Sequence, residues 1–520
     1  MTEWTLHPDR ALPADPTTRP VAREIYETTQ DLPIVSMHGH VDVAAFADDT
    51  PFPDPAQLFV VPDHYLTRML VSQGTPLPAL GVGPSGTPGL ETDPRAIWRR
   101  FCSGWKHFRG TPTRYWLEHE LVEIFGVTQR PSAETADAIY DQIAARLAEP
   151  GFRPRALLDQ FRIETIATTD PAWSDLAQHR ALAAQLGSLA DSTAGAVTRT
   201  GGASADGGGG GDVASGAVPT GSTVATLPAP RVVPTFRPDP LLHLDQPAWR
   251  TDIDRLAAAA DTQIGDYAAY LAALRERRRA FVAAGGSATD HGHLSADTTP
   301  LPDDVAADVF ARALAGAGVT AAEAAAFSGH MLFQMAAMSC EDGLTMQLHP
   351  GVLRNHDPER LAMFGPDKGY DIPVVTEYTN ALRPVLEAFG HAENFRLIAF
   401  TVDEDAFSRE LAPLAGVYPA LRLGAPWWFL DEPDAMRRFR EAATGTAGFS
   451  NLSGFVDDTR AFCSIPARHD LARRIDAGYL ARLVVEHRLD LDEAVDTASD
   501  LAYRLPKQAY PTPADAPAGV

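Results

Sequence analysis

The sequence predicts an α/β fold, a (β/α)₈ barrel of the TIM type with a helical insertion after its first strand. Short apolar runs that suit buried strands alternate with longer stretches that suit helices, and this order favours a parallel sheet. Eight such runs occur, which is the number that closes a barrel. The chain has 520 residues, of which 45% are hydrophobic, so it can bury a core of that size.

The predicted strands are short and follow one another along the chain. They are residues 33–37, 163–169, 232–236, 287–290, 344–348, 396–401, 418–423 and 452–456. The fourth has weak β propensity. Helical stretches lie between most of them, for example residues 252–284, whose apolar stripe ends at Gly285 and Gly286.

Two regions lie outside this alternation. Residues 1–30 form an N-terminal extension with a helix expected near residues 21–30. Residues 44–160 form a long, mainly helical insertion after the first strand, with helices expected at 94–102, 113–125 and 133–147. Because the loops that follow barrel strands build active sites, we expect this insertion to form a wall of the pocket.

Residues 191–230 have a different composition from the rest of the chain. They are rich in Gly, Ser, Thr and Ala and include five consecutive glycines, so they cannot bury enough apolar surface to offset the entropy of ordering. We therefore expect disorder. Strand-like runs flank the segment, so we interpret it as an insertion within one domain that spans residues 1–520. We hypothesise that residues 201–226 are dispensable.

The net charge of -24 and the pI of about 5.0 exclude whole classes of partner. Such an acidic surface repels nucleic acid and anionic lipid. The three cysteines are scattered and give no disulfide framework. The chain has neither a signal-peptide pattern nor an apolar run of about 18 residues. We expect a cytoplasmic protein with no nucleic-acid or membrane partner.

A candidate metal site begins directly after the first predicted strand, at His38 and His40. Residues two apart in a strand point the same way, so both imidazoles face one point inside the barrel. Neutral imidazole is a common zinc ligand. Asp458 ends the eighth run, which lies beside the first strand once a barrel closes, so it could complete the metal site and act as a base. Arg460 could bind an anionic group through its planar guanidinium.

Other polar residues also stand at predicted strand ends: Arg237, Asp290 with His291, and His349. Because these strand ends share one rim of a barrel, we expect the side chains to converge there. A second His-x-His pair, His291 and His293, we interpret as polar histidines at a loop edge.

At these positions the chain resembles uronate isomerase (glucuronate isomerase), a divergent branch of the amidohydrolase superfamily. The resemblance covers nearly the whole chain outside the Gly-rich segment. It rests on His38-Gly39-His40, Asp63-His64-Tyr65-Leu66, Thr168-Thr169-Asp170, Pro234-Thr235-Phe236-Arg237-Pro238-Asp239, Asp290-His291-Gly292, Gln347-Leu348-His349 followed by Arg354-Asn355, Trp427-Trp428-Phe429 and Asp458-Thr459-Arg460.

The resemblance implies interconversion of an aldehyde-form uronate and its keto isomer, and a chain that forms a homo-oligomer. It implies one divalent metal ion, zinc or else manganese, held by His38, His40 and Asp458, with His349 near or on the ion. The substrate-binding residues that it implies are His64, Arg237, Trp427 and Arg460. The catalytic residues that it implies are Tyr65, Asp290, His349 and Asp458, and the base that removes the C2 proton is either Tyr65 or Asp458.

Two other functions compete with this one. A metal-dependent hydrolase of the same superfamily, acting on a carboxylated substrate, would often carry a lysine or glutamate at the fourth strand and a metal-binding histidine at the sixth. The sixth run here ends in Thr401-Val402-Asp403 instead. A sugar-acid-binding protein without activity would show a damaged ligand set, whereas His38, His40 and Asp458 are all present.

Overall fold

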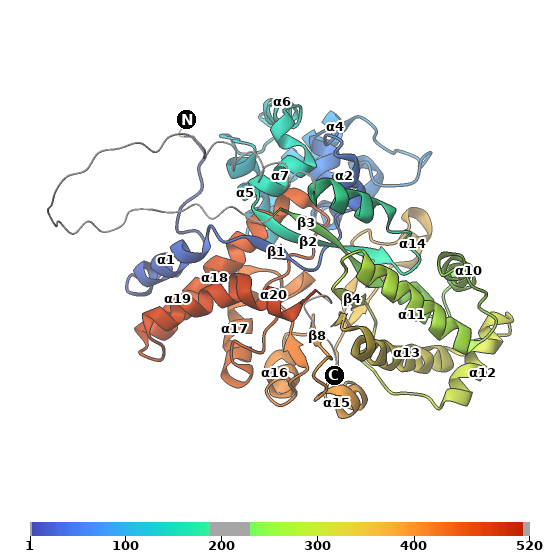
Figure 1. The fold of residues 1–520 in the computed structure, drawn as a ribbon. Coiled ribbons are helices and arrows are strands. Elements are labelled where there is room, and N and C mark those ends of the chain that lie inside the picture. Colours follow the sequence, from blue (N-terminus) through green and yellow to red (C-terminus); the bar gives the residue numbers. More distant parts are fainter. Residues whose placement is uncertain (1–2, 188–228, 513–520) are drawn as a thin grey trace, which may run out of the picture.

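The computed structural model describes residues 3–187 and 229–512. A parallel sheet of seven strands curls through its centre, and each strand pairs with the next one in chain order (Figure 1). The strands are β1 (Ile34–Ser36), β2 (Ile163–Pro171), β3 (Arg231–Arg237), β4 (Ala288–His291), β5 (Thr345–Leu348), β8 (Leu397–Ala399) and β9 (Leu421–Leu423). Seven of the predicted strands are therefore confirmed. The predicted disorder of residues 191–230 falls almost entirely outside the described residues.

The eighth predicted strand, residues 452–456, forms only one isolated parallel bridge among the described residues, between Leu423 and Leu452. The reason is local, because Gly454 has a φ of 78°, which takes the chain out of the extended conformation. The chain then reaches β1, where the Asp458 amide donates to the His38 carbonyl at 3.2 Å and the His40 amide donates to the Thr459 carbonyl at 2.9 Å. These two bonds close the ring of strands, so the predicted barrel is confirmed.

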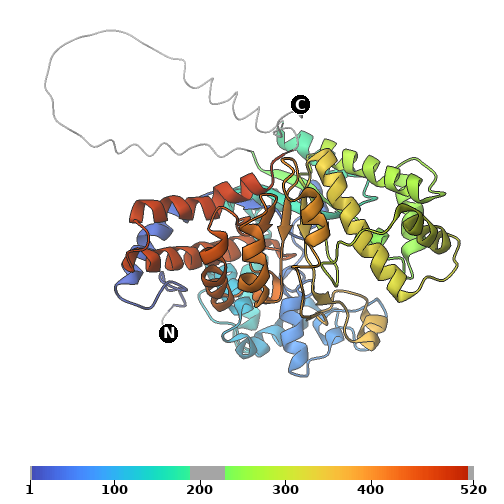
Figure 2. The same cartoon turned by 90° about the horizontal axis from the view of Figure 1, so that it is seen from below.

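Helices cover the outside of the sheet (Figures 1 and 2). After β3 the chain forms the helices α9 (Asp239–Leu242), α10 (Trp249–Ala259), α11 (Tyr267–Ala283), α12 (Asp303–Leu314), α13 (Ala321–Asp342), α15 (Arg383–Phe389), η6 (Phe407–Leu411), α16 (Ala412–Ala415), η7 (Trp428–Leu430), α17 (Pro433–Ala447), η8 (Phe462–Ser464) and α18 (Ile465–Val485). Of these, η7 begins with Trp428, which lines the pocket described below. A short hairpin of β6 (Val352–Leu353) and β7 (Ile372–Pro373) follows β5 and encloses α14 (Pro358–Phe364).

The helix predicted over residues 252–284 is wrong in one respect, because it is two helices. Asp261 has a φ of 47°, which ends α10, and the Asp266 side chain accepts a hydrogen bond of 2.8 Å from the Ala269 amide and starts α11. The sequence contains this N-cap signal, but the apolar spacing continues across it and hides the break.

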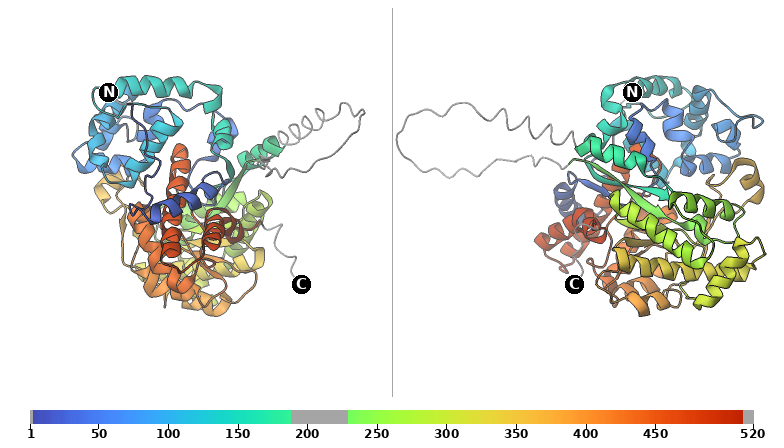
Figure 3. Two further views of the ribbon diagram at one scale, coloured as in Figure 1. Left: turned by 90° about the vertical axis from the view of Figure 1, so that its left-hand side faces the viewer. Right: turned by 45° about the vertical axis from the view of Figure 1, so that its right-hand side comes forward.

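The insertion after β1 gathers in one body at one side of the barrel (blue to cyan in Figure 3). It holds α2 (Val43–Asp48), η1 (Ala56–Val60), α3 (His64–Ser72), η2 (Leu77–Leu80), α4 (Pro94–Gly104), η3 (Trp105–Phe108), α5 (Pro112–His119), η4 (Glu120–Ile124), α6 (Ala136–Leu147), η5 (Pro150–Phe152) and α7 (Pro154–Gln160). The three predicted helices are confirmed, with boundaries shifted by up to three residues and with the second divided between α5 and η4. Fully buried aromatic rings such as Trp98, Phe101 and Phe125 fill this body, and each is worth roughly 2–3 kcal/mol of burial.

The N-terminal extension contributes α1 (Thr18–Thr29), which packs against α18 and the C-terminal helix α19 (Leu491–Ser499) (Figure 1). The Tyr26 hydroxyl donates to Asp470 at 2.5 Å, which ties the two ends of the chain together. After α19 the described chain continues through η9 (Asp500–Arg504) and α20 (Leu505–Ala509). Among the described residues, no helix is both long and apolar enough to cross a membrane.

Candidate active site

One pocket lies where the carboxyl ends of the strands meet the insertion, with about 560 Å³ of empty space that includes open solvent at its mouth. Every residue that the sequence analysis assigned to catalysis, substrate or metal lines it: His38, His40, His64, Tyr65, Arg237, Asp290, His349, Trp427, Asp458 and Arg460. Residues more than 400 positions apart in the chain therefore converge on one cavity.

Backbone hydrogen bonds position the end of β1 in this pocket. Besides the two bonds that close the barrel, the Thr169 hydroxyl at the end of β2 donates to the Gly39 carbonyl at 2.8 Å. Asp458 has a φ of 42°, a left-handed conformation that is unfavourable for a residue with a Cβ atom. Such strain persists where the surroundings impose it and is common at functional sites. With this backbone conformation, the Asp458 carboxylate faces the two histidines.

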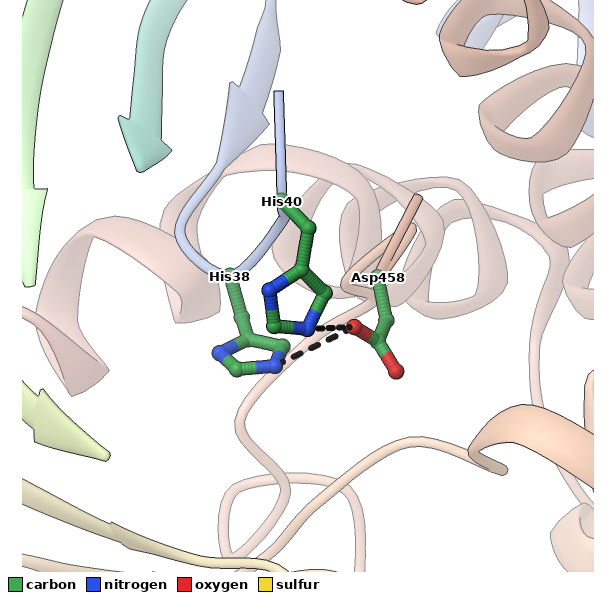
Figure 4. A group of neighbouring side chains, drawn as sticks. All are labelled: His38, His40 and Asp458. Carbon is green, nitrogen blue, oxygen red and sulfur yellow. Dashed lines mark ion pairs between the residues drawn. The ribbon is translucent and has the colours of Figure 1, made fainter. Parts of the chain in front are cut away.

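His38, His40 and Asp458 form a candidate metal group (Figure 4). The Nε2 atoms of His38 and His40 lie 3.2 and 3.0 Å from the same oxygen, Asp458 Oδ1, yet this oxygen has no hydrogen-bond partner. Ligand atoms about 2.1 Å from one ion lie about 3.0–3.4 Å apart, so these spacings fit a shared metal ion. The other carboxylate oxygen, Oδ2, accepts a hydrogen bond from the Trp427 indole. The donor set therefore fits a divalent ion.

His349 belongs to a second group, with His38 and Asp290. His349 Nδ1 donates to Asp290 at 2.7 Å, and the ring stacks between Phe400, 4.0 Å away, and His38, 4.4 Å away. Its Nε2 has no hydrogen-bond partner. Burial lowers the pKa of His349 to about 4, so the ring is neutral at neutral pH and this nitrogen has a lone pair available.

The pocket contains arginines at two depths. Arg237 lies deep, with Nε 2.8 Å from Asp239 and Nη1 3.3 Å from Asp290. Burial by itself would raise the pKa of Asp290, but Arg237, His38 and His349 together outweigh it and hold that pKa well below its ordinary value. Arg460 lies nearer the solvent and pairs with Asp367 at 2.9 Å. Arg354 lies over the Trp428 ring at 4.5 Å.

His64 and Tyr65 come from the insertion and begin α3. The Asp63 side chain caps this helix by accepting from the Tyr65 amide at 2.8 Å. Burial, assisted by the nearby Arg460, lowers the pKa of His64 to about 3, so His64 is neutral. Burial raises the pKa of Tyr65, so its hydroxyl stays protonated and can donate a hydrogen bond or a proton.

The sequence analysis assigned no site role to Arg354, Trp428 or Thr459, which also line the pocket. Arg354 and Trp428 stand in motifs that carried the resemblance, and Thr459 lies between two assigned residues. Trp428 has a φ of 53°, a backbone feature with no signal in the sequence. The order of elements along the chain does not predict that Arg354 lies at the pocket. Its position depends on the β6–β7 hairpin, in which Arg354 directly follows β6.

The chain folds as a parallel barrel, and a candidate metal centre is formed by two histidines after the first strand and an aspartate after the last segment. This combination defines the class of protein as the amidohydrolase type. The sequence profile of the glucuronate isomerase family matches residues 17–189 and 226–510. The chain belongs to this family.

Individual relatives agree over almost the full length. A uronate isomerase from Rhizorhabdus wittichii is 50% identical over 505 residues, covering 97% of this chain and 98% of the relative. One from Rhizobium meliloti is 48% identical, covering 97% of this chain and 99% of the relative. The crystal structure of glucuronate isomerase from Caulobacter crescentus superimposes with a TM-score of 0.86 at 44% identity, with 97% of both chains covered.

Proposed function

We propose that the chain interconverts an aldehyde-form hexuronate and its keto isomer, such as D-glucuronate with D-fructuronate or D-galacturonate with D-tagaturonate. The observation that carries the proposal is that the candidate metal group and the arginines line one pocket. The family membership supports the reaction class. The hydrolase alternative has no comparable support, because the relatives that match over the full length are isomerases.

His38, His40 and Asp458 are the proposed ligands of one divalent ion. Two imidazoles and a carboxylate suit zinc, and manganese is the alternative. A bound divalent ion stabilises the negative charge that develops on the substrate oxygens. Trp427, which donates to the second oxygen of Asp458, holds this carboxylate in the orientation that ligation requires.

The proposed proton transfers use two groups with opposite character. Moving a carbonyl from C1 to C2 transfers one proton from C2 to C1 and one from the C2 hydroxyl to the oxygen on C1. It therefore needs a base that takes the C2 proton and returns it at C1, and a second group that gives a proton to the C1 oxygen and recovers one from the C2 hydroxyl. Asp458 is the proposed base, because its carboxylate stands at the candidate metal group, where the substrate oxygens would bind. The buried Tyr65 hydroxyl remains protonated and is the donor.

The substrate carboxylate is proposed to bind Arg460 at the pocket mouth. A guanidinium binds a carboxylate through two parallel hydrogen bonds. In the part of the chain that the structure describes, Arg460 pairs only with Asp367. Arg237, which two buried carboxylates already hold, is better placed to contact a substrate hydroxyl or carbonyl oxygen deep in the pocket. The neutral His64 supplies a further hydrogen bond.

We also propose that the chain forms a homo-oligomer. Five of the exposed large apolar side chains fall within one segment, residues 353–375: Leu353, Leu361, Met363, Ile372 and Val375, the last 90% exposed. Burying such side chains is a common reason for association. Light scattering of the purified chain tests this, and a monomer at micromolar concentration would contradict it.

The reaction is tested by proton NMR of the zinc- or manganese-loaded protein with D-glucuronate and D-galacturonate in D₂O. We expect the signals of the ketouronate to appear and the preferred substrate to convert faster. Asp458→Asn is expected to abolish conversion. Failure of a folded, metal-loaded protein to convert either sugar would overturn the proposed reaction.

A further inference from the structure

A third group of potential metal ligands lies beside the pocket but does not line it. It consists of Asp239 at the start of α9, His291 at the end of β4 and His293 two residues later, and their ligand atoms lie within 4.8 Å of one another. All three side chains are buried, with at most 7% of Asp239 exposed. His291 and His293 do lie where a strand passes into a loop, as interpreted from the sequence, but both side chains are buried.

Each imidazole of this group uses one nitrogen and leaves the other without a partner. His291 Nε2 lies 3.0 Å from the Thr289 hydroxyl, and His293 Nδ1 lies 3.0 Å from the Ser328 hydroxyl. Among residues 3–187 and 229–512, His291 Nδ1 and His293 Nε2 have no hydrogen-bond partner, and neither does Asp239 Oδ1. The distance from His293 Nε2 to Asp239 Oδ1 is 3.7 Å, too long for a hydrogen bond between them.

Three buried polar atoms without partners at one point are costly, because each has lost its hydration and gained no hydrogen bond in return. Choosing another tautomer does not remove the cost, because the free nitrogen then carries a proton with no acceptor. When each imidazole instead donates to its hydroxyl partner, both free nitrogens present lone pairs beside a carboxylate oxygen. Hydrogen bonds that fix the tautomer in this way are typical of metal-binding histidines.

We propose that Asp239, His291 and His293 bind a second divalent transition-metal ion of the zinc class. Two imidazole nitrogens and one carboxylate oxygen are the donors such ions prefer. The half-buried His243 ring lies 4.7 Å from the ring of His293.

The second ion has a structural role in supporting the pocket. The other oxygen of Asp239, Oδ2, accepts from Arg237 Nε at 2.8 Å and from the Gly292 amide at 2.9 Å. A Cβ atom at Gly292 would lie 2.8 Å from the Arg237 guanidinium, so a side chain here would displace Arg237 from Asp239. An ion on Oδ1 therefore fixes the carboxylate that orients Arg237. This inference does not depend on the proposed reaction.

The test is X-ray diffraction from crystals of the full chain, loaded with zinc and then dialysed, on both sides of the zinc absorption edge. We expect two anomalous peaks, one at His38, His40 and Asp458 and the other at Asp239, His291 and His293. A single peak at the first site, with water or no density at the second, would overturn the proposal. A second peak lost on dialysis would overturn it too.

Metal analysis of variants gives an independent answer. His293→Gln is expected to lower bound zinc from about two equivalents to about one, and His40→Asn to remove the other equivalent. The matched control is His179→Gln, which removes a buried histidine bound to Thr168 and should change neither equivalent. If His293→Gln retains both equivalents, the proposal fails. If this variant does not fold, the diffraction result on the unaltered chain decides.

Discussion

The two walls of the pocket differ in origin and in how they are held. The barrel wall consists of side chains at strand ends, including His38, His40 and Asp458, which backbone hydrogen bonds between neighbouring segments fix. The inserted wall consists of residues 62–65 at the start of α3, carried on a body with its own aromatic core. The barrel wall therefore supplies most of the charged groups, including Arg237, Arg460 and Asp458, and the inserted wall supplies the neutral side chains of His64 and Tyr65.

This difference suggests a division of labour. Strand pairing holds atoms to within tenths of an ångström, which metal ligation requires. A helix N-terminus on a separate body tolerates change more easily, so His64 and Tyr65 are where we expect substrate preference to be adjusted. Substitutions in the two walls should consequently produce different kinetic and metal-binding results.

The largest expected effect is that of His40→Asn in the barrel wall. Loss of a metal ligand should lower kcat about 10³-fold or more and remove one equivalent of bound metal. Steady-state kinetics and metal analysis measure the two effects. His64→Gln in the inserted wall is the matched control and should keep the metal. A His40→Asn variant with unchanged metal content and unchanged kcat would contradict the assignment of metal binding to the barrel wall.

Arg460→Ala, also in the barrel wall, should act on binding more than on chemistry. Losing the guanidinium that binds the substrate carboxylate should raise KM about 10–100-fold with a smaller change in kcat. Arg460→Lys should recover only part of the loss, because an ammonium group cannot make the paired hydrogen bonds. Arg383→Ala, which removes an exposed partner of Glu387 outside the pocket, is the control. An unchanged KM would place the carboxylate elsewhere.

Tyr65→Phe tests the inserted wall. Without the hydroxyl that donates the proton, kcat should fall about 10–100-fold while bound metal stays the same. Tyr140→Phe removes a hydroxyl from the same inserted body outside the pocket and should leave kcat unchanged. Loss of metal from Tyr65→Phe would show that the two walls are not separate in function.

The barrel was predictable because its signals are local and repeated. The apolar runs follow one another in the sequence in the same order as the strands in the sheet, and a polar residue follows several of them. Because parallel strands share one rim, Arg237, Asp290 and His349 come together there. The inserted residues His64 and Tyr65 could not be placed in this way. Their position depends on how the insertion folds back, and only the resemblance to a family indicated them.

Features that depend on tertiary contacts were not predictable. The eighth strand is reduced to a bridge by the left-handed Gly454, and apolar spacing hides the break between α10 and α11 at Asp261. The burial of His291 and His293 also has no signal in the sequence, because α9 and α13 cover them from outside the local segment. Such positions are set by packing between distant elements.

The junction between the inserted body and the barrel should respond to pH through His119. This histidine ends α5 and contacts Arg10, with Asp470 on α18 at 3.8 Å and Arg474 nearby. Burial, with help from Arg10, lowers the pKa of His119 to about 4. Below pH 6.5 the unfolded chain therefore binds a proton that the folded chain does not, and stability falls as the pH drops toward 4.

His119→Gln should remove this dependence. Between pH 7 and pH 4.5 the variant should lose about 2 kcal/mol less free energy of unfolding than the unaltered chain, as measured by urea titration at each pH. Equal losses in both proteins would mean that His119 is protonated in the folded state and that the junction is more open than the structure shows.

The smallest effect is expected from deleting residues 201–226, which lie outside the described residues. The family profile matches residues 17–189 and 226–510 and passes over the residues between them, so almost all of the deleted segment lies outside the match. On either side, β2 and β3 pair in parallel register from Thr165 with Arg231 to Pro171 with Arg237, and Arg237 reaches the pocket from this ladder. The ladder depends on residues outside the deletion, so kcat, KM and the urea midpoint should stay within experimental error. A deletion that lowers kcat while the protein remains folded would assign the segment a role in the pocket, and one that prevents folding would show that the return from β2 to β3 needs its length.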